Sequence, residues 1–306
     1  AVAFADFLKE SGQTLWQMLP VNPVDGACGN SPYSSISAFA GNTLLISPER
    51  MCEDGLIERS DIESAPRFPE GRSDYDGAGN FREPLFRKAF ARFEKDGRLR
   101  EEFARFRERM SGWLADFTRF LVLKREFGGA VWSDWPSPYR DRTPDALDRL
   151  AREFGGELEY LSFLQFIFFR QWELFKNACV ERGVRIIGDI PIYVTHDSPE
   201  VWAHRRRFRI DKEGRPLAVA GVPPDYFSET GQLWGNPVYD WDELGREGYS
   251  FWIDRIAHNL SLFDLVRIDH FRGLVAYWEV PAGEKTAVNG RRSEEHTSEL
   301  QSRQVI

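Results

Sequence analysis

The feature of the sequence that most constrains the fold is the stretch Ser261–Gly273, SLFDLVRIDHFRG. Its segment Phe263–Ile268 is short, mostly apolar and rich in residues that favour strands, which predicts a buried strand of a parallel sheet. Arg267 and Asp269 lie two residues apart at the end of this strand and should share one face, where the guanidinium favours an ionised carboxylate. Barrels of alternating strands and helices place catalytic groups at such strand ends. From this stretch alone, a structural ion pair is the preferred interpretation, because ion pairs are common and catalytic carboxylates are few.

The composition is that of an ordinary globular protein, with 306 residues, 42% of them hydrophobic and 29% charged. The net charge of -8 argues against nucleic acid or an anionic membrane as a partner. No apolar run is long enough to span a bilayer, and no signal peptide is visible at the start. The three cysteines, Cys28, Cys52 and Cys179, are far apart and show no metal-ligand spacing. We therefore expect a cytoplasmic protein with no metal and no other cofactor.

Residues 1–45 are predicted to contain a helix, a strand and a binding loop. Apolar residues recur at helical spacing in Ala1–Ser11, and Thr14–Leu19 is predicted as a strand that ends at Pro20. The loop that follows, up to residue 42, is rich in Gly, Pro, Asn and Ser. A long polar loop directly after a strand is a candidate binding loop.

The middle of the chain is predicted to alternate between insertions and helix–strand units. Residues 46–155 have helical apolar stripes, which predict a helical insertion. In residues 156–197, the long helix Leu158–Arg182 ends at Gly183 and leads into the strand Val184–Ile187, which is followed by Asp189. Residues 198–247 form a second insertion with a polar, aromatic, glycine-rich loop. Residues 248–290 supply another helix and the strand Phe263–Ile268.

Three predicted strands, ending near Leu19, Asp189 and Asp269, each lead into polar residues, with helices between them. This order predicts an α/β fold, a (β/α) barrel.

Four motifs in this order resemble the 4-α-glucanotransferases, the amylomaltases or disproportionating enzymes of glycoside hydrolase family 77. They are LPVNP with GNSPYSSISAFAGN, GDIPIYV, VAGVPPDYFSETGQLWGNPVYDW, and VRIDHFRGLVAYWEVP, and the resemblance extends over almost all of residues 1–291. It implies an α-amylase-type (β/α)8 TIM barrel with helical and loop insertions. It also implies transfer of α-1,4-glucan segments between maltooligosaccharides with retention of configuration, as in starch, glycogen and maltodextrin metabolism.

The resemblance implies a role for each matching residue. Asp269 matches the nucleophile that forms the glycosyl-enzyme intermediate, and Arg267 matches the arginine that positions it. Asp189 matches an aspartate that binds the sugar in the donor site. Ser31 and Tyr33 match a substrate-contacting loop, although Tyr33 would equally serve as a loop anchor.

A second set of matching residues follows from the resemblance. Tyr226, Phe227, Gln232 and Trp234 match a loop that covers the active site; a core tryptophan is the alternative for Trp234. His270 is a further candidate for substrate binding. In a regular strand it would point to the face opposite Asp269, so a packing histidine stays possible.

The chain departs from the family at both ends, which predicts a truncated, incomplete barrel. The family's first strand should precede Ala1, and four further βα units should follow Gly290. Those units supply the acid/base Glu and a second catalytic Asp; Glu279 and Glu284 lie in the wrong context to replace that Glu. Residues 291–306 are interpreted as a non-native tail, because RSEEHTSELQS has no apolar period and resembles translated adaptor DNA. The fragment itself is expected to be inactive and poorly folded.

Two other functions remain open from the residues. One is an α-amylase-family hydrolase, with water as the acceptor. The other is a non-catalytic glucan-binding protein that uses Trp234, Tyr226 and Tyr33. The Arg267–Asp269 pair argues against the second, because binding alone does not need it.

Overall fold

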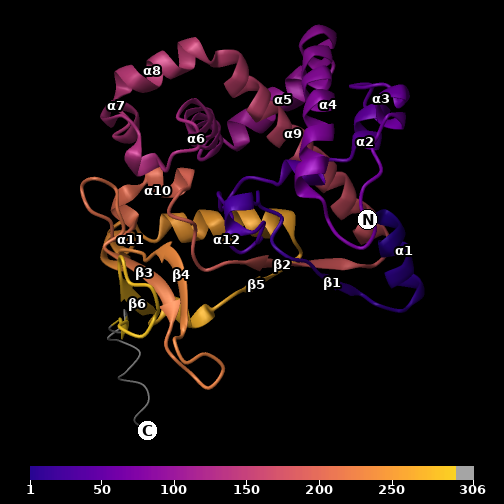
Figure 1. Ribbon diagram of the computed structural model, residues 1–306. Helices are drawn as coiled ribbons and strands as arrows, with labels where there is room; N and C mark the ends of the chain where they lie inside the picture. Colours follow the sequence, from indigo (N-terminus) through magenta and orange to yellow (C-terminus); the bar gives the residue numbers. More distant parts are fainter. Residues whose placement is uncertain (294–306) are drawn as a thin grey trace.

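The computed structural model of the protein describes residues 1–293 (Figure 1). The predicted non-native tail, 291–306, therefore lies outside the described residues from position 294 onward. Within the described chain, no helix is long and apolar enough to cross a membrane. The same residues contain no group of three or more His, Cys, Asp or Glu side chains that could hold a metal ion.

A parallel sheet of three strands organises the molecule. Its strands are β1 (Leu15–Gln17), β2 (Arg185–Ile190) and β5 (Leu265–Ile268), in the order β1-β2-β5. A helix precedes each strand: α1 (Val2–Glu10), α9 (Gly155–Glu181) and α12 (Ser250–Leu262). Because all three strands run in one direction, their C-terminal ends meet at one edge of the sheet.

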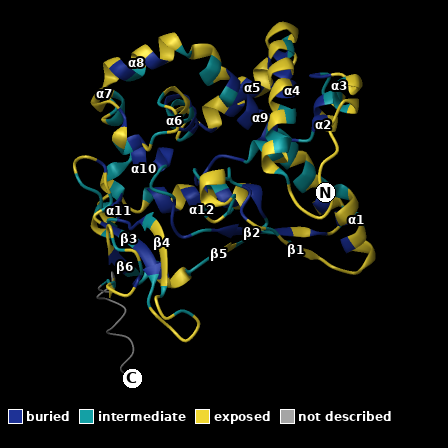
Figure 2. Ribbon diagram, in the orientation of Figure 1, coloured by how far each residue is buried: buried dark blue, intermediate teal, exposed yellow. Residues whose placement is uncertain are grey.

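The prediction that Phe263–Ile268 forms a buried strand is wrong for most of its length. Phe263 is buried, but β5 begins only at Leu265 and alternates between exposed and half-buried residues, as β1 does. The physical reason is position, because β1 and β5 are the two edges of the sheet and only β2 has a strand on both sides. Figure 2 shows the contrast, with β2 mostly dark blue and β1 mostly yellow.

Helix α9 is the central element of the larger apolar core. It buries Tyr160 and every residue from Ser162 to Phe169, and it ends before Gly183, whose φ of 73° is in the left-handed region that favours glycine. Val184 then enters the core with no exposed surface and leads into β2. Helix α9 packs against β2 and α12 on one side. On the other side it contacts the helical region described next.

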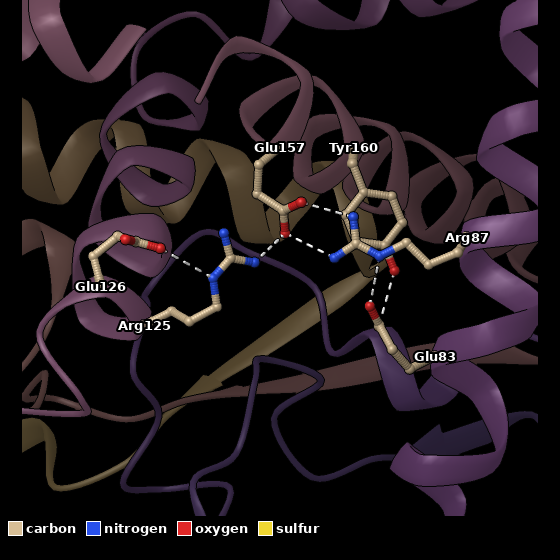
Figure 3. A network of polar contacts seen from close by, with 6 residues as sticks. All are labelled: Glu83, Arg87, Arg125, Glu126, Glu157 and Tyr160. Atoms are coloured by element: carbon tan, nitrogen blue, oxygen red, sulfur yellow. Dashed lines mark hydrogen bonds and ion pairs between the residues drawn. The ribbon is translucent and has the colours of Figure 1, made fainter. Parts of the chain in front are cut away.

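Residues 46–155 are helical and extend from the sheet (Figure 1). The elements are α2 (Pro48–Glu53), α3 (Arg59–Glu63), α4 (Tyr75–Asp96), α5 (Arg100–Arg109), α6 (Leu114–Glu126), α7 (Ser137–Arg140) and α8 (Pro144–Glu153). Their aromatic stripes join α9 in one core; Phe93, for example, packs 4.9 Å from Phe163 between ring centroids. Ion pairs between α4, α6 and α9 lie at the surface of this region (Figure 3).

A second, antiparallel sheet was not expected from the sequence. It has the order β4-β3-β6-β7 and comprises β3 (Ala218–Val222), β4 (Gln232–Pro237), β6 (Trp278–Pro281) and β7 (Arg291–Arg292). The segment predicted as a covering loop therefore contains strand β4. Two short helices, α10 (Pro199–Ala203) and α11 (Trp241–Arg246), flank β3 and β4 in the chain.

Candidate active site

Two acidic residues and one arginine meet at the C-terminal edge of the parallel sheet. Asp189 is the fifth residue of β2 and is the register partner of Arg267 on β5. Asp269 follows β5, and its backbone N–H donates to Ile190 O at 2.9 Å. A Cβ at Gly188 would lie 2.1 Å from the Phe263 ring, so glycine allows the two strands and their flanking core to pack this closely.

Arg267 bridges the two carboxylates. Its Nη1 donates to Asp189 Oδ2 at 2.7 Å, and its Nη2 donates to Asp269 Oδ1 at 2.5 Å. The negative charges of Asp189 and Asp269 raise the pKa of the Arg267 guanidinium above its ordinary value. The predicted pairing of Arg267 with Asp269 is therefore present, and Arg267 also contacts Asp189 on the neighbouring strand.

Tyr33 reaches the same cluster from the loop after β1. Its hydroxyl donates to Asp189 Oδ2 at 2.8 Å, across 156 residues of sequence. This hydrogen bond is the main cause that raises the pKa of the Tyr33 phenol. Ser31 lies two residues earlier in the same loop, where its carbonyl accepts from Ser34 N–H at 3.1 Å. The structure thus brings Tyr33 into the cluster, and it places Ser31 beside that loop segment without a side-chain contact to the cluster among the described hydrogen bonds.

The cluster keeps unused hydrogen-bonding capacity. Asp189 is only 2% exposed, yet its Oδ1 has no hydrogen-bond partner within the described part of the chain. Asp269 and Arg267 are partly exposed at the surface of the same edge. A buried, unpartnered carboxylate oxygen is costly unless a ligand completes it. Asp269 presents its second oxygen at this exposed edge, and Asp189 Oδ1 can accept a ligand hydroxyl once the side chains that cover it move aside.

An aromatic group borders the cluster on the side of the second sheet. Trp234 on β4 is 37% exposed and packs edge-to-face on His270, with 5.0 Å between ring centroids. Its Nε1 donates to Gln232 Oε1 at 3.1 Å. Burial lowers the pKa of His270 below its ordinary value. Trp234 is therefore not a core tryptophan, and Gln232, Trp234 and His270 form one group.

The expectation that His270 points away from the site assumed a regular strand. Strand β5 ends at Ile268, and His270 has a φ of 50°, in the left-handed region. The alternation of side chains along a strand therefore no longer applies at this residue. This turn directs the His270 ring onto Trp234.

Two predicted residues are not brought to the cluster. Tyr226 and Phe227 lie in the connection between β3 and β4 and are 97% and 93% exposed. They contact each other edge-to-face, with 5.7 Å between ring centroids. The structure therefore does not show this part of the loop covering the active site.

Sequence reasoning missed three buried residues behind the cluster. Tyr193 packs on Trp234, and its buried hydroxyl has no partner among the described residues. Glu200 and Arg255 are buried charged side chains that hold loops next to the cluster. Tyr193 lies inside the motif GDIPIYV, and a charged residue inside an otherwise apolar helical stretch was the available signal for Arg255.

Comparison with known proteins identifies the family. The sequence model of the family described as 4-alpha-glucanotransferase matches residues 1–303. The chain belongs to this family. It is 50% identical over 290 residues to the 4-alpha-glucanotransferase of Thermus thermophilus, and 47% identical over 291 residues to that of Aquifex aeolicus. These matches cover 94% and 95% of this chain, but only 57% and 58% of the two relatives.

The fold class is confirmed by a solved structure. The amylomaltase from Streptococcus agalactiae in complex with acarbose matches with a TM-score of 0.91 at 37% identity. The match covers 96% of this chain and 59% of that protein. The three parallel strands with their preceding helices are therefore part of a (β/α) barrel of the amylomaltase type.

Proposed function

We propose that the whole protein is a 4-α-glucanotransferase that transfers α-1,4-glucan segments between maltooligosaccharides, and that this chain supplies its nucleophile. The observation on which the proposal depends is the bridge from Arg267 to both Asp189 and Asp269, with one oxygen of each carboxylate left without a hydrogen bond among the described residues. A structural ion pair has no need of unused acceptor atoms at a strand edge. A glycosyl-transfer site needs them to bind sugar and to attack it.

In the proposed reaction, Asp269 attacks the anomeric carbon of the donor, and the bond to the leaving sugar oxygen breaks. This forms a covalent glycosyl-enzyme, and attack by an acceptor hydroxyl then restores the original configuration. Arg267 fixes the nucleophile through Oδ1 and leaves the other oxygen to react. Asp189 Oδ1 accepts a hydroxyl of the donor sugar, and Tyr33 holds the other oxygen of Asp189.

The first step also needs a protonated carboxyl group about 5 Å from the nucleophile. The family resemblance assigns this acid to a motif that residues 1–306 do not contain. We therefore propose that residues 1–306 alone do not complete the reaction. All activity tests below use the whole protein.

Transfer rather than hydrolysis requires that a sugar hydroxyl outcompete water at the intermediate. His270 directly follows Asp269, and its ring packs on Trp234, so the two rings present apolar surface next to the proposed nucleophile. Such surface excludes water and offers a face on which a sugar ring stacks. The cytoplasm is the proposed location, because Cys28, Cys52 and Cys179 are all free thiols.

The experiment compares Asp269→Asn with the control Asp254→Asn, an exposed aspartate on α12, in the whole protein. Incubation with maltotriose should yield longer and shorter maltodextrins with little new reducing power. Loss of the nucleophile should lower this rate on the order of 10⁴-fold or more, while the control keeps the wild-type rate. Near-wild-type transfer by Asp269→Asn would refute the assignment. Accumulation of reducing ends by the wild type would identify a hydrolase, and binding without turnover would identify a glucan-binding protein.

A further inference from the structure

Buried side chains fix the backbone of the loop that contains Tyr33. Ser35 Oγ lies 2.8 Å from both Pro23 O and Ser37 O and donates its single proton to one of them, which closes the loop on itself. Further along, Gln165 of α9 bonds both backbone groups of Gly41, at 2.8 and 3.0 Å. The position of the Tyr33 hydroxyl therefore depends on a segment whose backbone is tied to other elements at several points.

Glu200 of α10 also fixes this loop, and it does so with a buried carboxyl group. Its Oε1 accepts from Ser37 Oγ–H at 2.7 Å and from Ala38 N–H at 2.9 Å. The residue is only 6% exposed, and its second oxygen is buried without a hydrogen-bond partner among the described residues. Burial raises the pKa of this carboxyl. A buried carboxyl group with half its capacity unused is an expensive way to hold a loop, when a neutral amide holds Gly41 close by.

Asp189, the partner of Tyr33, lies near the end of β2, and the backbone after this strand is fixed by Arg255 of α12, which is also buried. Its Nη2 donates to Pro191 O at 2.6 Å and its Nη1 to Ile192 O at 3.1 Å. The Tyr239 hydroxyl donates to the same Ile192 oxygen at 2.8 Å. The backbone just after Asp189 is thus held by one buried cation, while the backbone just after Tyr33 is held by one buried carboxyl group.

We propose that Glu200 is a positioning residue for the transfer reaction, which sets the Tyr33 hydroxyl on Asp189 through Ser37 and Ala38. The inference rests on the proposed function, because its effect on rate passes from Tyr33 to Asp189 and then through Arg267 to the nucleophile. Glu200 touches none of the reacting groups. The alignment of a hydrogen bond in the site accounts for a buried acceptor oxygen at this position despite the cost of burying it.

A double-mutant cycle in the whole protein tests the route of action. Tyr33→Phe should lower kcat/KM about tenfold or more, because it removes a hydrogen bond to a charged acceptor. Glu200→Ala should also lower kcat/KM about tenfold, since two donors lose their acceptor. If Glu200 acts through Tyr33, adding Glu200→Ala to Tyr33→Phe should cost less than about twofold more. Glu200→Gln keeps a carbonyl oxygen at the position of Oε1 and should restore most of the rate.

The matched control is Glu279→Ala. Glu279 of β6 is another buried carboxylate and pairs with Arg209. Its removal should destabilise the protein, but its effect on kcat/KM should add fully to that of Tyr33→Phe. If Glu200→Ala does not fold, Ser37→Ala takes its place in the same cycle. Ser37→Ala removes one of the two donors to Glu200 and should destabilise the fold less.

Amide hydrogen exchange separates failure of this inference from failure of the proposed function. Exchange in residues 31–41 should be faster in Glu200→Ala than in the wild type and close to normal in Glu200→Gln, whatever the activity. Additive rate effects of Glu200→Ala and Tyr33→Phe, or unchanged exchange of this segment, would overturn the inference. An inactive wild-type protein with the expected exchange pattern would overturn the proposed function alone.

Discussion

Two arginine–carboxylate clusters in this protein contain the same kinds of group and are built differently. In the helical region, Glu157 of α9 accepts from both Nη1 and Nη2 of Arg87 of α4, at 2.7 and 2.8 Å. Arg125 of α6 also donates to Glu157, at 2.6 Å (Figure 3). Glu83 accepts from Arg87 Nε and from the Tyr160 hydroxyl. Both oxygens of each of these two glutamates have partners, and three helices are joined.

The strand-edge cluster also joins three parts of the chain, namely β2, the end of β5 and the loop after β1, but it leaves acceptors unused. Arg267 divides its donors between Asp189 and Asp269, and Asp189 Oδ1 is buried without a partner among the described residues. A fully satisfied network indicates a structural role, whereas a buried unsatisfied oxygen indicates a place for a ligand. This difference supports the proposed ligand-binding role of Arg267 and Asp269 over a purely structural ion pair.

Among variants that compare the two clusters, Arg267→Lys is expected to have the largest effect on the transfer rate. A lysine ammonium cannot reproduce the fork with which arginine reaches two carboxylates at once. The transfer rate, measured as maltotriose disproportionation by the whole protein, should fall about 10²-fold. Arg87→Lys is the matched change in the helical cluster and should leave the rate within about twofold, because that site is remote from the chemistry. Equal losses in both variants would mean that the two clusters do not differ in function.

A smaller effect is expected on stability from Glu157→Gln. This change should lower the free energy of unfolding by about 1–2 kcal/mol near neutral pH, since it replaces an anion between two arginines. Hydrogen bonding from Arg87 lowers the pKa of Glu157, so the folded protein protonates it at lower pH than the unfolded chain does. The stabilisation is therefore fully present above the unfolded pKa and is lost as the pH falls through the folded pKa.

Denaturant titrations between neutral pH and pH 3 provide the measurement. The gap between the wild type and Glu157→Gln should narrow on acidification. Glu159→Gln, an exposed neighbour on the same helix, should show no such gap. A gap that stays constant with pH would show that the charge of Glu157 does not stabilise the helices.

The smallest effect is expected from Trp234→Ala. Removal of the ring that packs on His270 should admit water to the intermediate and raise the share of hydrolysis a few-fold, with a smaller change in total turnover. New reducing ends per transfer event give this ratio directly. Leu217→Ala, an exposed residue next to β3, should leave it unchanged. An unaltered ratio in Trp234→Ala would mean that the aromatic group does not control whether water or a sugar hydroxyl is the acceptor.

Local pattern was sufficient for part of the fold and site. The strands that end near Asp189 and Asp269 follow from short apolar runs with Gly and polar residues behind them, and the pairing of Arg267 with Asp269 follows from strand alternation. The family resemblance supplied the proposed roles of Tyr33 and Trp234, which no periodicity indicates.

Other features depend on contacts between distant parts of the chain. The bond from Arg267 to Asp189 requires the register of β2 against β5, and the bond from Tyr33 requires a loop 156 residues away. The second sheet pairs β3 with β6 across two intervening strands and two α-helices, so neither partner has a strong local signal. Burial of Phe263–Ile268 was overestimated because sequence does not show which strands lie at an edge.

The most direct test of the central claim is to find the covalent intermediate. The whole protein would be incubated with a donor whose glycosyl-enzyme hydrolyses slowly, such as a fluorinated glucosyl fluoride, then quenched in acid, digested and analysed by mass spectrometry. The account predicts one added sugar on the peptide that contains Asp269, and none in Asp269→Asn. A sugar attached to Asp189 or to any other carboxylate, in an enzyme that turns over, would contradict it.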